Sequence, residues 1–168
     1  MADGKVGRAE FLHRFGGIYE HSPWVAEEAY DEAAGDIDPD DPERLAQIFA
    51  RRVDRADRER KLALIRSHPD LADRAAIAGG LTAASRAEQQ SAGIDRCTPE
   101  EYERFQELNR RYKQKFGFPF VMAVRGGSRQ EILTAFAARL KNDPETEFAT
   151  AIKEIHKIAN LRLNANAR

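Results

Sequence analysis

The sequence predicts an all-α protein, a single compact domain of roughly seven to nine helices joined by short loops. Apolar residues recur at helical spacing along most of the chain, and no stretch alternates apolar and polar residues as a half-buried strand does. Helix-start signals, an N-cap residue followed by proline, recur at Asp41-Pro42, Thr98-Pro99 and Asp143-Pro144. The length of 168 residues fits one hydrophobic core, so residues 1–168 are expected to form one domain.

The first third of the chain predicts three helices. Phe11 and Phe15 share one helical face, and Gly16-Gly17 then ends that helix. Ser22-Pro23 predicts the next start, with the serine as N-cap and the proline at the first helical position. Asp41-Pro42 repeats this signal before a third amphipathic run. Residues 1–7 precede the first pattern and are expected to be a flexible N-terminus.

The second half of the chain predicts further helices and one non-helical segment. Thr82 opens a helix that Gly93 closes, and Thr98 with Glu101 forms a capping box before a long aromatic-rich stripe. A second capping box is expected at Ser128 and Glu131. Residues 118–124 are instead continuously apolar without helical polarity, which predicts a buried extended segment or a buried turn.

Composition excludes several functional classes. The formal net charge of −1 and the mixing of Lys and Arg with Asp and Glu do not favour nucleic acid as a partner. No apolar run approaches the ~20 residues that span a bilayer, and the N-terminus lacks signal-peptide features, so no membrane association is expected. The single cysteine, Cys97, excludes an internal disulfide and is typical of a reducing compartment. We therefore expect a cytoplasmic protein.

The usual cofactor and metal motifs are missing. The chain has no glycine-rich nucleotide fingerprint, no phosphate-cradling loop, no Cys-x-x-Cys and no His-Glu-x-x-His. Its four histidines, at positions 13, 21, 68 and 156, show no metal-ligand spacing. A site built from ordinary side chains, with no metal, is the remaining expectation.

Two pieces of sequence could supply such a site. His68 precedes a proline, which disfavours helix for the residue before it, so His68 should lie at a helix break. It could be a helix-end cap or a catalytic base, and spacing alone favours neither. Downstream, Ser85, Glu88 and Gln89 share one helical face, which could line a polar pocket or could be a solvated face.

Several motifs together resemble one known family. They are His68-Pro69-Asp70-Leu71-Ala72, then Ser85-x-x-Glu88-Gln89, then Phe105-x-x-Leu108-Asn109-x-x-Tyr112-x-x-Lys115-Phe116-Gly117-Phe118-Pro119-Phe120-Val121, and near the end Ile158-Ala159-x-Leu161-Arg162-Leu163. In order and spacing this series is similar to 2-oxo-4-hydroxy-4-carboxy-5-ureidoimidazoline (OHCU) decarboxylase, a carboxy-lyase that makes (S)-allantoin in urate breakdown. The likeness covers nearly the whole chain from Phe11.

The resemblance implies an all-helical enzyme without a cofactor that acts on a small molecule and often forms a homodimer. It puts His68 in the catalytic position, with Glu88 as a second residue in the proton chemistry. The substrate-contacting residues that it implies are Pro69, Ser85, Gln89, Phe120, Val121, Met122, Ala123, Val124 and Arg162.

Two alternatives stay open from the residues alone. One is a metal-dependent hydrolase that uses His68, Glu88 and His156. The other is a helical binding module in which residues 118–124 form a groove for a partner. Neither accounts for the full series of motifs.

Overall fold

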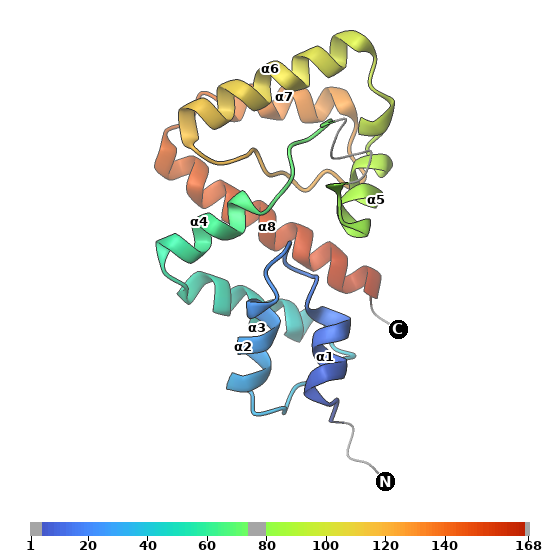
Figure 1. Cartoon of the computed structure of the whole chain (residues 1–168), viewed down its shortest axis with the longest axis vertical. Coiled ribbons are helices and arrows are strands. Elements are labelled where there is room, and N and C mark those ends of the chain that lie inside the picture. Colours follow the sequence, from blue (N-terminus) through green and yellow to red (C-terminus); the bar gives the residue numbers. More distant parts are fainter. Residues whose placement is uncertain (1–4, 74–79, 167–168) are drawn as a thin grey trace. The chain divides into compact units, whose positions relative to one another are not determined.

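The computed structural model describes residues 5–73 and 80–166, which form eight α-helices, one short 3₁₀ helix and no strand (Figure 1). The prediction of an all-α fold with seven to nine helices is therefore confirmed. The helices are α1 (Arg8–Phe15), α2 (Trp24–Glu32), α3 (Pro42–Arg55), α4 (Arg58–Arg66), α5 (Ala83–Ser91), η2 (Ile94–Arg96), α6 (Pro99–Phe116), α7 (Arg129–Arg139) and α8 (Pro144–Asn166).

Contacts divide the chain into two compact units. Unit 1 comprises Met1–Ser67 and Ile155–Arg168, and unit 2 comprises His68–Glu154. Helices α1 to α4 belong to unit 1, while α5 to α7 belong to unit 2, and α8 contributes residues to both. That residues 1–168 act as one domain stays a prediction.

Unit 1 is built around an aromatic cluster. Phe11 and Phe15 of α1 lie 4.8 Å apart between ring centroids, and Phe49 of α3 meets both rings edge-on. Phe11 and Phe49 are fully buried. Burying a side chain of this size stabilises a fold by roughly 1.5–3 kcal/mol, so these rings contribute to holding α1 against α3.

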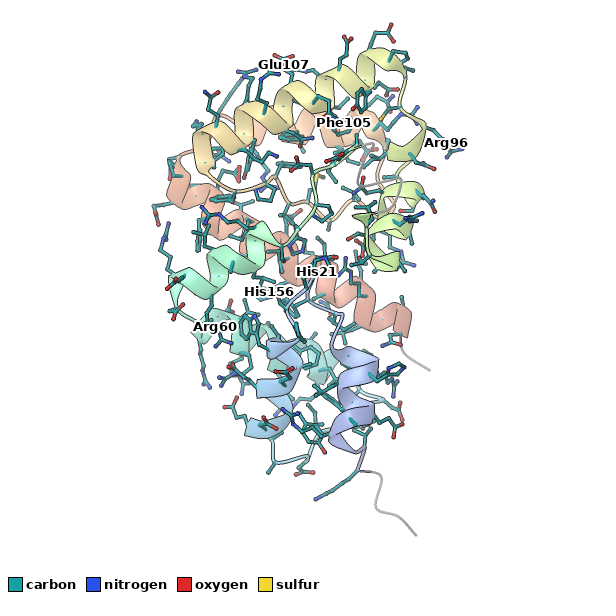
Figure 2. All side chains as sticks on the ribbon, viewed as in Figure 1. His21, Arg60, Arg96, Phe105, Glu107 and His156 are labelled. Atoms are coloured by element: carbon teal, nitrogen blue, oxygen red, sulfur yellow. The ribbon has the colours of Figure 1, made fainter. Side chains whose placement is uncertain are left out.

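Unit 2 has its own core, along the inner face of α6. Phe105, Leu108 and Tyr112 are fully buried at helical spacing, whereas Glu107 lies on the outer side of the same helix (Figure 2). Helix α7 packs against α6 and adds Ile132 and Phe136, both fully buried. The aromatic stripe in the sequence is thus a core stripe.

Most helices begin where the sequence predicts. The Asp41 carboxylate accepts from the Arg44 N–H, and Thr98 and Glu101 form the complete capping box. Ser128 accepts from the Glu131 N–H and also lies 3.2 Å from the Glu131 carboxylate. One prediction was wrong. The Ser22 hydroxyl does not cap α2 but donates to the Glu20 carbonyl, and α2 begins one residue late, after Pro23.

Two other expectations concern the N-terminus and membrane-spanning helices. Of the N-terminal residues 1–7, the first four lie outside the described part, and the Val6 carbonyl accepts from the Tyr30 hydroxyl. The expected flexibility of residues 1–7 stays a prediction. None of the helices in the described ranges is long and apolar enough to cross a membrane.

Candidate functional site

His68 lies directly after a helix, as predicted. Helix α4 ends at Arg66, and the hydroxyl of Ser67, its C-cap, lies 2.6 Å from the Leu64 carbonyl. His68 and Pro69 then continue without regular secondary structure, because proline cannot extend the helix. His68 is 8% exposed, so the imidazole is buried in the fold rather than solvated.

The residues that follow His68 are held by two side chains of helix α6. The Leu71 carbonyl accepts from the Asn109 amide at 2.9 Å, and the Ala72 carbonyl accepts from Gln106 at 3.1 Å. Ala72 has a φ of +59°, a left-handed conformation that costs an alanine energy and therefore needs such contacts to persist. Helix α6 thereby fixes where the chain runs after the histidine.

Helix α5 presents the predicted polar face, and part of it is buried. Ser85 and Gln89 are 4% and 3% exposed, whereas Glu88 is half-buried. The Gln89 side-chain oxygen accepts from the Ala72 N–H at 3.2 Å, which links α5 to the segment after His68. This bond assigns the amide orientation and leaves the NH₂ group of Gln89 as the donor it can offer a ligand. The solvated-face interpretation fails for Ser85 and Gln89.

Residues 120–124 have no regular secondary structure, as predicted for a buried extended segment. Phe120, Val121 and Val124 are buried, and Met122 and Ala123 are half-exposed. Without a helix or sheet, the peptide groups of such a segment need other partners. Two come from side chains: the Val121 carbonyl accepts from Arg139 at 2.6 Å, and the Ala123 N–H donates to the Glu154 carboxylate at 3.4 Å.

Arg139 belongs to a buried charged network in unit 2. Its Nε lies 3.1 Å from both carboxylate oxygens of Glu147, and Glu147 is fully buried. The Tyr112 hydroxyl donates to the same carboxylate at 3.1 Å. Burial raises the pKa of Tyr112 well above its ordinary value, so its phenol keeps the proton that makes this bond.

Arg162, the last predicted substrate residue, lies in unit 1. Its guanidinium donates to the Glu20 carboxylate at 2.8 Å and to the Ile18 carbonyl at 3.2 Å. The side chains of Arg162 and Glu20 are 7% and 1% exposed, so this is a buried ion pair. Glu20 thus fixes the orientation of Arg162, which the resemblance assigns to the substrate.

Comparison with known proteins assigns the family. The family model described as OHCU decarboxylase matches residues 5–164. The chain belongs to the OHCU decarboxylase family. It is 45% identical over 154 residues to the 2-oxo-4-hydroxy-4-carboxy-5-ureidoimidazoline decarboxylase of Haloferax volcanii, a match that covers 91% of this chain and 86% of that relative.

Two further relatives extend the comparison. The crystal structure of an (S)-allantoin synthase matches with a TM-score of 0.76 and 33% identity, over 96% of this chain and 51% of that one. The uric acid degradation bifunctional protein of Bacillus sp. strain TB-90 is 40% identical over 163 residues, which are 95% of this chain but 30% of that relative. The OHCU decarboxylase fold therefore occurs both alone and within longer proteins.

His156, which the metal-hydrolase alternative includes beside His68 and Glu88, lies on α8 in unit 1 (Figure 2). Its Nδ1 lies 2.8 Å from the Tyr19 hydroxyl and its Nε2 lies 2.9 Å from Asp54. Both ring nitrogens are therefore engaged by oxygen atoms. In the described ranges, no three or more His, Cys, Asp or Glu side chains group as a metal site would require.

Sequence reasoning missed four polar residues that shape these regions: Gln106, Arg139, Glu147 and Glu20. Glu147 looks like an ordinary acidic residue in the first turn of a helix, and Arg139 like a basic residue in a last turn. Asn109 did carry a signal, since an amide within a stripe of buried apolar residues needs a buried partner.

Proposed function

We propose that this chain decarboxylates OHCU to (S)-allantoin without a cofactor, as a step in urate degradation. The observation that carries the proposal is the family match over residues 5–164, which includes every position assigned to the site. The relatives reported above are named for OHCU decarboxylation, (S)-allantoin synthesis and uric acid degradation. The buried polar residues His68, Ser85 and Gln89 provide a setting in which such a substrate can be recognised.

The substrate itself explains why side chains can suffice. Loss of CO₂ leaves an electron pair that needs a sink, which cofactors often supply. In OHCU the carboxylate-bearing carbon is bonded to a ring carbon with an imine-type nitrogen, and the pair moves into that conjugated system. A proton is then added at the carbon that carries the ureido group, while the adjacent hydroxyl becomes the ring carbonyl. Addition from one face gives the S product.

His68 is proposed as the proton-transfer residue. Its imidazole would hydrogen-bond the substrate hydroxyl or the departing carboxylate and exchange a proton there, a role that histidine suits near neutral pH. Glu88 would hold the histidine or a ring nitrogen in the required protonation state. Its half-buried position on α5 is compatible with contact to a ligand.

The remaining residues would bind and orient the substrate. Ser85 and the Gln89 NH₂ group would read the ureido and ring carbonyls, and Pro69 would pack on the ring. Backbone groups of residues 120–124 would stabilise the charge that develops on the substrate ring. Arg162 would pair with the substrate anion. This role is supported by the resemblance and by its guanidinium, which is buried and oriented by Glu20.

The test is the chirality of the product. Freshly generated OHCU decays spontaneously to racemic allantoin, so circular dichroism with and without the protein measures stereoselective turnover. We expect a signal of one sign that His68→Asn abolishes while far-ultraviolet circular dichroism shows an intact fold. Racemic product from the wild-type chain would refute the proposed function, and wild-type turnover by His68→Asn would refute the role of His68.

A homodimer in the cytoplasm is also proposed. The dimer rests on the resemblance, and the compartment rests on the single cysteine, Cys97, which excludes an internal disulfide. Light scattering coupled to gel filtration should give about twice the 18.9 kDa chain mass. A monomeric mass for active protein would contradict the dimer.

A further inference from the structure

Residues 120–124 have a short stretch whose peptide groups are not used by the fold. The Val124 carbonyl accepts from the Gly127 N–H, and the side chains of Arg139 and Glu154 bind the Val121 carbonyl and the Ala123 N–H. Met122 lies between these two fixed points. Among the described residues, none hydrogen-bonds the peptide N–H or carbonyl of Met122, which is half-exposed.

Arg139 contacts this segment in two ways. Its Nη1 donates to the Val121 carbonyl at 2.6 Å, a short charge-assisted bond. The same guanidinium lies 4.3 Å from the ring centroid of Phe120, and the Phe136 ring stacks on Phe120 with centroids 3.8 Å apart and an interplanar angle of 9°. Arg139 therefore fixes both the backbone and the first side chain of the segment.

Arg139 is itself held rigidly. Its Nε and Nη2 lie 3.0–3.1 Å from the carboxylate of Glu147, which also accepts from Tyr112 and Asn142. Such a buried ion pair is costly to desolvate, and an apolar replacement of similar shape would often be as stable. The network is thus better explained by the geometry that it imposes than by stability. Only arginine has donors in a planar fork that can serve a carboxylate and a carbonyl together.

We propose that Arg139 is a positioning residue of the substrate site, which acts through the Val121 carbonyl and the Phe120 ring to hold the Met122 peptide groups where the substrate ring binds. This inference rests on the proposed function and assigns a role to a residue that the motifs do not include. Glu147 and Tyr112 serve it by orienting the guanidinium.

The decisive variant is Arg139→Lys, which keeps the charge and removes the fork. We expect KM for OHCU to rise about tenfold, the size of one lost charge-assisted bond, and the enantiomeric excess of allantoin to fall. KM does not depend on how much of the protein is folded. The enantiomeric excess is compared at protein concentrations high enough for turnover to outpace the spontaneous racemic decay of OHCU, so a role in stability alone would leave both quantities unchanged.

The matched control is Arg129→Lys in the same helix. Arg129 pairs with Glu101 and the Gly93 carbonyl, not with residues 120–124. It should lose stability but retain KM and enantiomeric excess. If Arg139→Lys does not fold, Tyr112→Phe carries the test, because it removes one hydroxyl from the network and keeps the buried ring. We expect a two- to threefold rise in KM for that variant, on the order of one neutral hydrogen bond.

The outcomes separate the two proposals. Racemic product from the wild type would refute the proposed function. The positioning role alone would be refuted if the wild type is (S)-selective and Arg139→Lys leaves KM and enantiomeric excess unchanged. If Arg139→Lys does not fold, the same result in Tyr112→Phe would refute it. Equal effects in Arg129→Lys would also refute it, because the change would then reflect general loosening of α7.

Discussion

In the described part of the chain, each unit contains an arginine–glutamate pair with little exposure to solvent. In unit 1, Arg162 binds Glu20 and the Ile18 carbonyl, and in unit 2, Arg139 binds Glu147 and the Val121 carbonyl. Both arginines use one part of the guanidinium for a carboxylate and another for a carbonyl of a non-helical segment. Their sequence separations differ: Arg162 and Glu20 are 142 residues apart, whereas Arg139 and Glu147 are 8 apart.

The difference shows that two arginine–glutamate pairs can have different roles. The pair in unit 1 includes a residue that the resemblance assigns to substrate, and Glu20 orients it. The pair in unit 2 includes no residue that the resemblance assigns to substrate, and its arginine contacts the proposed substrate segment, residues 120–124, through the Val121 carbonyl and the Phe120 ring. Ion pairs in a low-dielectric interior have a defined geometry. Each pair can therefore fix the position of the non-helical segment whose carbonyl its arginine binds.

The largest effect is expected from breaking the pair in unit 2. Glu147→Ala leaves the Arg139 cation, whose side chain is only 13% exposed, without its carboxylate, and the free energy of unfolding should fall by about 3–5 kcal/mol. Urea denaturation at neutral pH measures this loss. Glu107→Ala is the control, because its pairs with Arg104 and Arg111 are on the surface and should cost about 0–1 kcal/mol. Equal losses in the two variants would contradict the distinction.

Breaking the pair in unit 1 from the arginine side should give a pH-dependent loss. Arg162→Gln leaves the Glu20 carboxylate buried without its cation, which raises the pKa of that group in the folded state. A raised acid pKa favours folding at low pH, so the loss of about 3 kcal/mol at pH 7 should shrink toward pH 5. A loss independent of pH would show that Glu20 is not desolvated.

A smaller effect is expected at Tyr112. Its hydroxyl donates one hydrogen bond to Glu147 at 3.1 Å, while its ring packs among Phe116, Phe120 and Phe136. Tyr112→Phe retains the ring, so the free energy of unfolding should decrease by only about 1 kcal/mol. Thermal unfolding measures the change. A loss comparable to that of Glu147→Ala would mean that the hydroxyl, and not the arginine, organises the network.

The smallest effect is expected from a charge at the surface. The Thr98 N–H and then the Arg129 guanidinium lower the pKa of Glu101 below its ordinary value of 4.5. A lowered acid pKa contributes stability that is present above the ordinary value and lost as pH falls through the folded value. Glu101→Gln should therefore make the unfolding midpoint less dependent on pH below about pH 5. An unchanged acid slope would refute a contribution from Glu101.

Local patterns determined most of the fold. Helical periodicity and caps such as Asp41 and Thr98 act over three or four residues, so they can be read from the sequence without the tertiary structure. The break at His68 followed from the proline beside it, and the apolar run predicted the non-helical residues 120–124. The Ser22 cap was wrong because a nearby carbonyl, that of Glu20, competed for the hydroxyl.

The candidate site divides in the same way. The sequence by itself supplied His68, Ser85, Glu88, Gln89 and Arg162, through motifs whose order resembles one family. Only the tertiary structure decided that Glu20 holds Arg162, that Gln106 and Asn109 fix the segment after His68, and that Arg139 binds the Val121 carbonyl. Each of these bonds joins residues at least 18 positions apart, beyond the reach of helical periodicity. In the sequence a buried arginine looks the same as a solvated one, because its partner is set by packing and not by spacing.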